Sequence, residues 1–135
     1  MIAVRMRSLV VAIVVTLAAL AGACDQDSQP SSGQGSGSQL ASEVQAMYSA
    51  KCERCHGVNG SGHGPFSDSL HPRPHDYTDP AWQASVTDDQ IKEVILRGGL
   101  NMHKNPAMPG SPMLKKRPEV LDGLVKLIRS FGKRP

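Results

Sequence analysis

The sequence predicts an all-α domain in which long loops join three main helices. Apolar residues recur at helical spacing in three segments, residues 38–51, 87–97 and 118–131. No segment shows the alternation of apolar and polar residues that is typical of a half-buried strand. The connecting segments are rich in glycine and proline, and loops of this length need a group to pack against.

The first helix is predicted over residues 38–51, and it runs directly into Cys52. Four apolar side chains form its predicted buried face: Leu40, Val44, Met47 and Tyr48. Residues 57–64 are polar and include four glycines, which predicts a loop. Residues 65–80 include four prolines and are predicted to be irregular and wrapped around another group.

The second helix is predicted to begin at a capping box, with Thr87 as the N-cap and Gln90 three residues later. Asp88 and Asp89 follow the cap and suit the positive end of the helix dipole. Three apolar residues form the predicted buried face: Ile91, Val94 and Ile95. Gly98 is expected to end the helix as a left-handed C′ residue.

The third helix is predicted over residues 118–131, after a proline-containing loop over residues 101–112. Pro118 suits the first helical position, where no backbone N–H donor is needed. Six residues give this helix an apolar stripe: Val120, Leu121, Leu124, Leu127, Ile128 and Phe131. Gly132 is expected to end it.

Residues 1–23 are predicted to be an export signal. Arg5 and Arg7 give a positive start, and a largely apolar, uncharged run follows from Leu9 to Ala23. This run is shorter than the ~20 apolar residues that a membrane-spanning helix needs.

The end of this signal, Leu20-Ala21-Gly22-Ala23-Cys24, resembles a bacterial lipobox, although the leucine lies one position further from Cys24 than usual. The resemblance implies that Cys24 is lipidated and anchors the chain to a membrane. The alternative is cleavage near Ala23, which would release a soluble periplasmic protein. The Ser/Gly/Gln-rich residues that follow the lipidated cysteine, within 24–39, are predicted to form a flexible linker.

Cys52-Glu53-Arg54-Cys55-His56 is the motif on which the functional prediction depends. Two cysteines three positions apart and followed directly by a histidine are typical of a c-type haem attachment site. The spacing lets each thiol form a thioether with one haem vinyl group and places His56 as an iron ligand. With only five aromatic residues in the chain, a single buried haem would supply the core that the loops need.

The second axial ligand decides the chemistry of the iron. Met108 is the preferred candidate because Pro109 follows it and fixes a turn that directs the sulfur inward. Three alternatives lie in the same region of the chain: Met102, Met113 and His103. A thioether ligand raises the reduction potential, whereas a second imidazole lowers it. The other histidines, His63, His71 and His75, are expected to be exposed loop residues.

These features together resemble a class I cytochrome c. The resemblance runs from about Leu40 to Phe131 and rests on the Cys-x-x-Cys-His motif, Tyr48 before it, Met108-Pro109 and the closing helix; the domain is assigned to residues 40–135. It implies that the first and last helices cross beside the haem. Family members usually have a glycine at this crossing. Here that residue is Val44, and Gly123 in the last helix is expected to allow the close approach instead.

The resemblance also implies roles for residues around the haem. A proline carbonyl is expected to accept the Nδ1–H of His56, and three prolines are candidates: Pro65, Pro72 and Pro74. Trp82 either donates its indole N–H to a haem propionate or packs in the core. Arg73 is a second candidate for neutralising a propionate.

A haem with both axial positions filled has no open site for a substrate, which predicts an electron carrier rather than an enzyme. The expected partners are redox proteins of a respiratory chain or a dehydrogenase complex, at the periplasmic side of a bacterial membrane. The alternative is a haem enzyme or gas sensor with an open or bis-histidine sixth position. A thiol–disulfide oxidoreductase is disfavoured because its Cys-x-x-Cys normally follows a strand rather than a helix.

The charge of the chain argues against a nucleic-acid partner. Fifteen basic residues oppose 12 acidic ones, and the excess of three falls to one without Arg5 and Arg7 of the export signal. No dense basic stripe with interleaved aromatic residues is present. Lys115, Lys116 and Arg117 form either a docking patch for an acidic partner or an ordinary solvated helix start.

Overall fold

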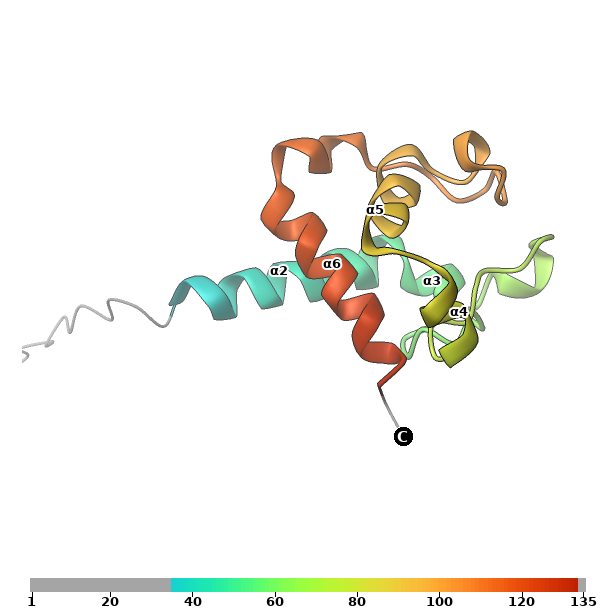
Figure 1. Cartoon of the computed structure of the whole chain (residues 1–135), viewed down its shortest axis with the longest axis horizontal. Helices are drawn as coiled ribbons and strands as arrows, with labels where there is room; N and C mark the ends of the chain where they lie inside the picture. Colours follow the sequence, from blue (N-terminus) through green and yellow to red (C-terminus); the bar gives the residue numbers. More distant parts are fainter. Residues whose placement is uncertain (1–34, 134–135) are drawn as a thin grey trace, which may run out of the picture. The chain divides into compact units, whose positions relative to one another are not determined.

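Helices account for all regular structure in residues 35–133, the part of the chain that the computed structural model describes. This part has five α-helices, with short 3-10 turns in the loops (Figure 1). They are α2 (Gly35–Lys51), α3 (Glu53–His56), α4 (Pro80–Ser85), α5 (Asp88–Arg97) and α6 (Pro118–Phe131). The prediction of an all-α domain is confirmed. None of the helices described is both long enough and apolar enough to cross a membrane.

The predicted export signal and Cys24 lie outside the described residues. The predicted flexible linker is wrong for residues 35–39, which form the first turns of α2; the rest of the linker lies outside the described residues. The first turns of α2 extend away from the other helices (Figure 1), and residues 36–39 are exposed.

Helices α2 and α6 pack against each other at the centre of the core (Figure 1). Val44 and Tyr48 of α2 are buried. Six residues of α6 are buried with them: Val120, Leu121, Leu124, Val125, Ile128 and Phe131. A Cβ atom on Gly123 would overlap Cγ2 of Val44, so α6 approaches α2 through this glycine. The predicted close approach at Gly123 is therefore confirmed.

We expect replacement of Gly123 by leucine to lower the free energy of unfolding of the holoprotein by about 2 kcal/mol, because the new side chain has no room beside Val44. Thermal unfolding followed by circular dichroism measures the change. Adding Val44→Ala should recover part of the loss, since it removes the atoms that clash. An unchanged melting temperature for the leucine variant would contradict a tight crossing.

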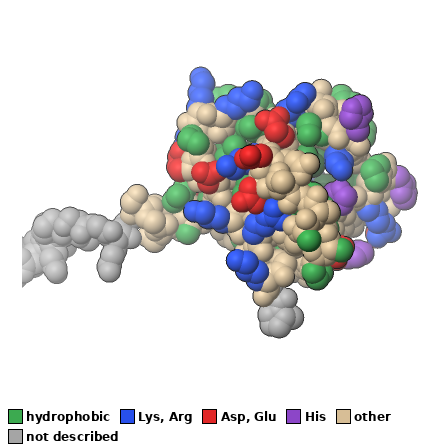
Figure 2. Space-filling view, viewed as in Figure 1, with side chains coloured by type: hydrophobic (Ala, Val, Ile, Leu, Met, Phe, Trp, Pro, Cys, Tyr) green, Lys and Arg blue, Asp and Glu red, His purple; other side chains and the backbone are tan. Residues whose placement is uncertain are grey.

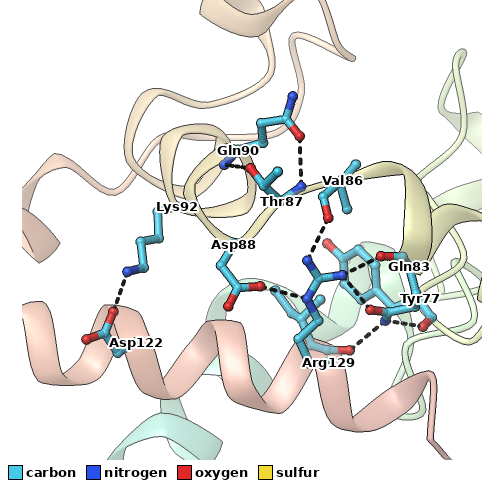
Figure 3. Close-up of polar contacts among 10 residues, drawn as sticks. Tyr77, Gln83, Val86, Thr87, Asp88, Gln90, Lys92, Asp122 and Arg129 are labelled. Atoms are coloured by element: carbon cyan, nitrogen blue, oxygen red, sulfur yellow. Dashed lines mark hydrogen bonds and ion pairs between the residues drawn. The ribbon is translucent and has the colours of Figure 1, made fainter.

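Helix α5 has the predicted capping box. The Thr87 side chain accepts from the Gln90 N–H at 3.2 Å, and the Gln90 side chain accepts from the Thr87 N–H at 2.8 Å (Figure 3). Ile91 is buried as predicted, whereas Val94 and Ile95 are only partly buried and the unpredicted Leu96 is buried. These outcomes indicate that a local hydrogen-bond signal predicted the start of α5 better than periodicity predicted its buried face.

The conformation of Gly98 corrects the predicted end of α5. Its φ is 75° and its ψ is 171°, so it is not a left-handed helical residue but lies in a region that essentially only glycine adopts. A Cβ atom there would lie 2.6 Å from the backbone nitrogen of Gly110. The close approach of the loop that returns after Met108 therefore also requires a glycine.

Helices α3 and α4 add to the three that the sequence predicts. Helix α4 begins with Pro80, and the Asp79 side chain caps it by accepting from the Ala81 N–H at 2.8 Å. Residues 65–80, which the sequence predicts to be irregular, therefore end at Pro80, the first residue of a helix that was not predicted. This helix lies next to a network that joins it to α6.

Arg129 of α6 is the centre of this network (Figure 3). Its guanidinium donates to both oxygens of Gln83, at 2.7 and 2.8 Å, to the Val86 carbonyl at 2.7 Å and to the Asp88 carboxylate at 2.8 Å. The Gln83 amide in turn donates to the Tyr77 carbonyl at 2.7 Å. The network thus ties the backbone of Tyr77 to the last helix, α6.

Candidate haem site

The Cys-x-x-Cys-His motif occupies one helical turn directly after α2. Cys52 lies between α2 and α3, and its N–H donates to the Tyr48 carbonyl at 2.8 Å. The Cys55 and His56 N–H groups both donate to the Cys52 carbonyl, at 3.1 and 2.9 Å. This turn brings two free, partly buried thiols and one imidazole together, as the sequence predicts.

The ionisation of Cys52 and His56 is controlled mainly by burial. Burial, and to a lesser degree the nearby Cys55, raises the pKa of the Cys52 thiol to about 11. Burial lowers the pKa of His56 to about 4, so its imidazole is neutral at neutral pH and has a lone pair to donate. A protonated thiol beside a neutral imidazole is the state from which thioether formation and iron ligation would start.

His56 also has an unpartnered ring nitrogen. Its side chain is buried, with 8% exposure of the residue, and Nδ1 has no hydrogen-bond partner among the described residues. A buried polar atom without a partner needs an explanation, and the carbonyl expected to accept from Nδ1–H is not supplied by residues 35–133. With Nδ1 assigned to a carbonyl, Nε2 is the nitrogen that would bind iron, and here it lies 3.2 Å from the Tyr77 hydroxyl. A neutral, buried imidazole on the same turn as two free thiols fits a covalently bound haem.

Tyr77 packs against the imidazole of His56. The two ring centroids are 4.6 Å apart with the planes at 13°, and the Tyr77 hydroxyl lies 3.2 Å from His56 Nε2. Tyr77 is itself buried and held by its N–H, which donates to the Gly60 carbonyl at 2.7 Å. No sequence pattern selects Tyr77, because the contact joins residues 21 positions apart.

None of the three candidate prolines provides the expected carbonyl partner for His56. The Pro72 carbonyl accepts from Asn105 instead, and that of Pro74 lies beside Gly62. The polar backbone group that favours protonation of His56 belongs to His75. Because Nδ1 has no hydrogen-bond partner among the described residues, the structure selects none of the three prolines.

The glycine-rich loop after the motif wraps around the aromatic core. Tyr48 donates its hydroxyl to the Gly57 carbonyl at 2.8 Å, which ties α2 to the start of the loop. Gly60 has a φ of 77°, and a Cβ atom on it would lie 2.6 Å from the Phe131 ring. The Phe131 ring packs 5.3 Å from that of Tyr48. The loop thus closes over the residues that join α2 and α6.

Met108 lies in a loop that is bonded to the end of α5. Its carbonyl accepts from the Gly99 N–H at 2.9 Å, and its N–H donates to the Asn105 carbonyl at 3.1 Å. Ser111 N–H then donates to the Ile95 carbonyl at 2.8 Å. The backbone on both sides of Met108 is therefore fixed relative to α5.

The alternative axial ligands differ in exposure. Met108 and Met102 are both partly buried, whereas Met113 is 71% exposed. His103 is exposed and adopts a left-handed backbone conformation with a φ of 52°. Partial burial favours Met108 and Met102 over the other two. Both have a backbone bond to Gly99, Met102 through its N–H at 3.0 Å, so the preference for Met108 rests on the Pro109 that follows it.

Trp82 and Arg73, the two candidates for contacting a haem propionate, have partners in the structure. Trp82 is partly buried and packs on Tyr77 with ring centroids 4.9 Å apart, and Arg73 pairs with Asp68 at 3.1 Å. The histidines that Figure 2 shows lie mainly over the loops, away from the start of α2. His63, His71 and His75 are all exposed, which confirms the prediction; partial burial and then Lys104 lower the pKa of His75. The described residues contain no group of three His, Cys, Asp or Glu side chains able to hold a metal.

The comparison with protein families places these residues in a known context. The family model for cytochrome c matches residues 41–131. This span includes both cysteines of the motif, His56, Tyr77 and Met108. A search of curated proteins finds no match.

Proposed function

Because the chain belongs to the cytochrome c family, we propose that it carries single electrons at the periplasmic side of a membrane, with His56 and Met108 as the axial ligands. Haem c is attached through Cys52 and Cys55 and supplies one-electron chemistry at its iron. Members of this family are generally electron carriers rather than enzymes. The observation that carries the proposal is the buried, neutral His56 imidazole on the same helical turn as two free thiols.

The protein's own contribution is to hold two neutral ligands with little freedom. His56 is kept neutral by burial and is packed against Tyr77. Met108 offers a thioether, which favours reduced iron and a higher reduction potential than a second imidazole would give. Two ligands held by the protein in this way would need little rearrangement when the iron changes oxidation state. This supports electron transfer over an enzyme with an exchangeable sixth ligand.

The proposed attachment to the membrane is through a lipid on Cys24, with the residues between Cys24 and the start of α2 at Gly35 as linker. The start of α2 supports this arrangement, because its first turns extend away from the other helices (Figure 1). A domain attached in this way can turn to meet a redox partner while it stays near the membrane surface.

The proposed partner is an acidic redox protein that docks beside the Met108 loop. No Asp or Glu lies between Glu93 and Glu119, whereas this segment contains five Lys and Arg residues. Arg117 is engaged with Glu43 and Glu119, but Lys115 and Lys116 have no ion pair with any described residue. Figure 2 shows basic side chains along the upper edge of this face. Leu100 and Met113, each 71% exposed, add apolar area to the same segment.

We expect Lys115→Glu combined with Lys116→Glu to slow oxidation of the ferrous protein by the anion hexacyanoferrate(III) about tenfold at low salt, because the attraction becomes repulsion. The rate of a cationic oxidant should instead rise. Stopped-flow absorbance measures both rates, and the differences should shrink as salt is added. Lys126→Glu on α6 is the matched control. Equal effects of the control and of the double variant would contradict a docking patch at this edge.

A further inference from the structure

One side chain joins the Met108 loop to the proline-rich segment that leads to Tyr77. Asn105 Nδ2 donates to the Pro72 carbonyl at 3.0 Å, across 33 positions of the sequence. The same side chain uses Oδ1 to accept from the Ala107 N–H at 2.9 Å, and its carbonyl accepts from Met108. Asn105 therefore builds the turn before Met108 and also links this turn to the other segment.

The turn before Met108 also packs on the backbone of Gly99, just after the end of α5. Gly99 donates to the Met108 carbonyl at 2.9 Å and accepts from the Lys104 N–H at 2.8 Å. A Cβ atom on Gly99 would overlap the Asn105 carbonyl, so the turn lies directly on this backbone. The bond to Pro72 is thus the contact that ties the turn to a second part of the domain.

The segment that contains Pro72 continues to the proximal side of the site. Five residues later it reaches Tyr77, whose ring stacks on His56. The influence of Lys104 on the pKa of His75 is a second sign that the two segments lie close together. Asn105 therefore connects the loop of one proposed axial ligand with the segment that packs against the other.

We propose that Asn105 is a positioning residue, which ties the Met108 loop to the segment beside His56 and so keeps the Met108 sulfur on the iron. This inference rests on the proposed His56 and Met108 ligation. A hydrogen bond at this level of exposure shifts the balance between a bound and a released Met108 loop by about three- to tenfold. An external ligand that replaces Met108 should bind more tightly by the same factor when the bond to Pro72 is lost.

The test is the affinity of the ferric holoprotein for free imidazole, followed by loss of the absorption band that arises from sulfur-to-iron(III) charge transfer. Asn105→Ala removes both side-chain bonds. Asn105→Asp keeps the acceptor for Ala107 but removes the donor to Pro72; it is measured at high salt so that the new charge is screened. Asn101→Ala is the matched control, because Asn101 donates only to Arg97 of its own helix end, at 3.0 Å.

We expect both Asn105 variants to bind imidazole about three- to tenfold more tightly than the natural sequence, and the Asn101 variant to bind it equally well. Unchanged affinity in Asn105→Ala overturns the role of Asn105. A change in Asn105→Ala without one in Asn105→Asp assigns the effect to the local turn and overturns the role of the Pro72 bond. Absence of the charge-transfer band from the unmodified protein would instead reject Met108 as a ligand, and with it the proposed function.

Discussion

Replacing Arg129 by methionine is expected to lower the free energy of unfolding of the holoprotein by about 3 kcal/mol. The guanidinium makes four hydrogen bonds to three residues, and the Arg129 side chain is only 24% exposed. Methionine retains much of the volume but leaves the Gln83 and Val86 carbonyls without this donor. Chemical denaturation of the holoprotein, followed by circular dichroism, measures the loss.

Arg117→Met is the matched control for this experiment. Arg117 also bonds two residues, Glu43 and Glu119, but its side chain is 48% exposed. Exposed ion pairs contribute little to stability, so the control should lose much less than Arg129→Met does. Similar losses for the two variants would mean that the network in Figure 3 has no special role in the fold.

Replacing Cys52 and Cys55 together by serine is expected to abolish covalent haem attachment, because serine cannot form the thioether bonds that a c-type haem requires. Mass spectrometry of the purified protein should show the mass of one haem in the natural sequence and none in this variant. We also expect the variant to lose much of its helical circular dichroism, since the loops between the helices would lose the group on which they pack.

Cys24→Ser separates the two proposed uses of cysteine in this chain. It should keep its haem and be released from the membrane fraction into the soluble fraction, because the proposed lipid can no longer be attached. Retention of the haem mass after loss of Cys52 and Cys55 would contradict attachment through the motif. Membrane association of the Cys24 variant equal to that of the natural sequence would contradict the anchor.

Helix starts that depend on residues within one turn of each other could be predicted from the sequence. The capping box of Thr87 and Gln90 depends on residues three positions apart. Pro118 favours the first position of α6 through its own fixed φ angle and missing N–H. Helix α4 was missed although Asp79-Pro80 is a local signal of the same kind. The density of prolines before it favoured an irregular segment, and six helical residues are too few to show a clear apolar period.

Hydrogen bonds between side chains and backbone groups far apart in the chain could not be predicted from the sequence. Arg129 meets Gln83 across 46 positions, and Asn105 meets Pro72 across 33. Neither pair has a sequence pattern that selects it over other polar pairs. The exception is Gly123, where a resemblance to a family of known fold made a glycine at the helix crossing expected.

The candidate site shows the same contrast between local contacts, which the sequence predicts, and long-range contacts, which it does not. The two thiols and His56 lie on one turn, so a five-residue motif was enough to bring them together. The environment of His56 comes from Tyr77 and the His75 backbone, which the chain reaches only after the glycine-rich loop and the prolines. Which carbonyl or hydroxyl lies nearest the imidazole is therefore decided by the path of about 20 intervening residues rather than by the motif.

The central claim is that the iron has two protein ligands and no open position. Absorption spectra of the purified holoprotein, reduced and then exposed to carbon monoxide, test this claim most directly. A spectrum that carbon monoxide leaves unchanged is the result we predict, because the proposed Met108 ligand would fill the sixth position. Rapid and complete conversion to a carbon monoxide spectrum would contradict the claim and favour a haem enzyme or gas sensor.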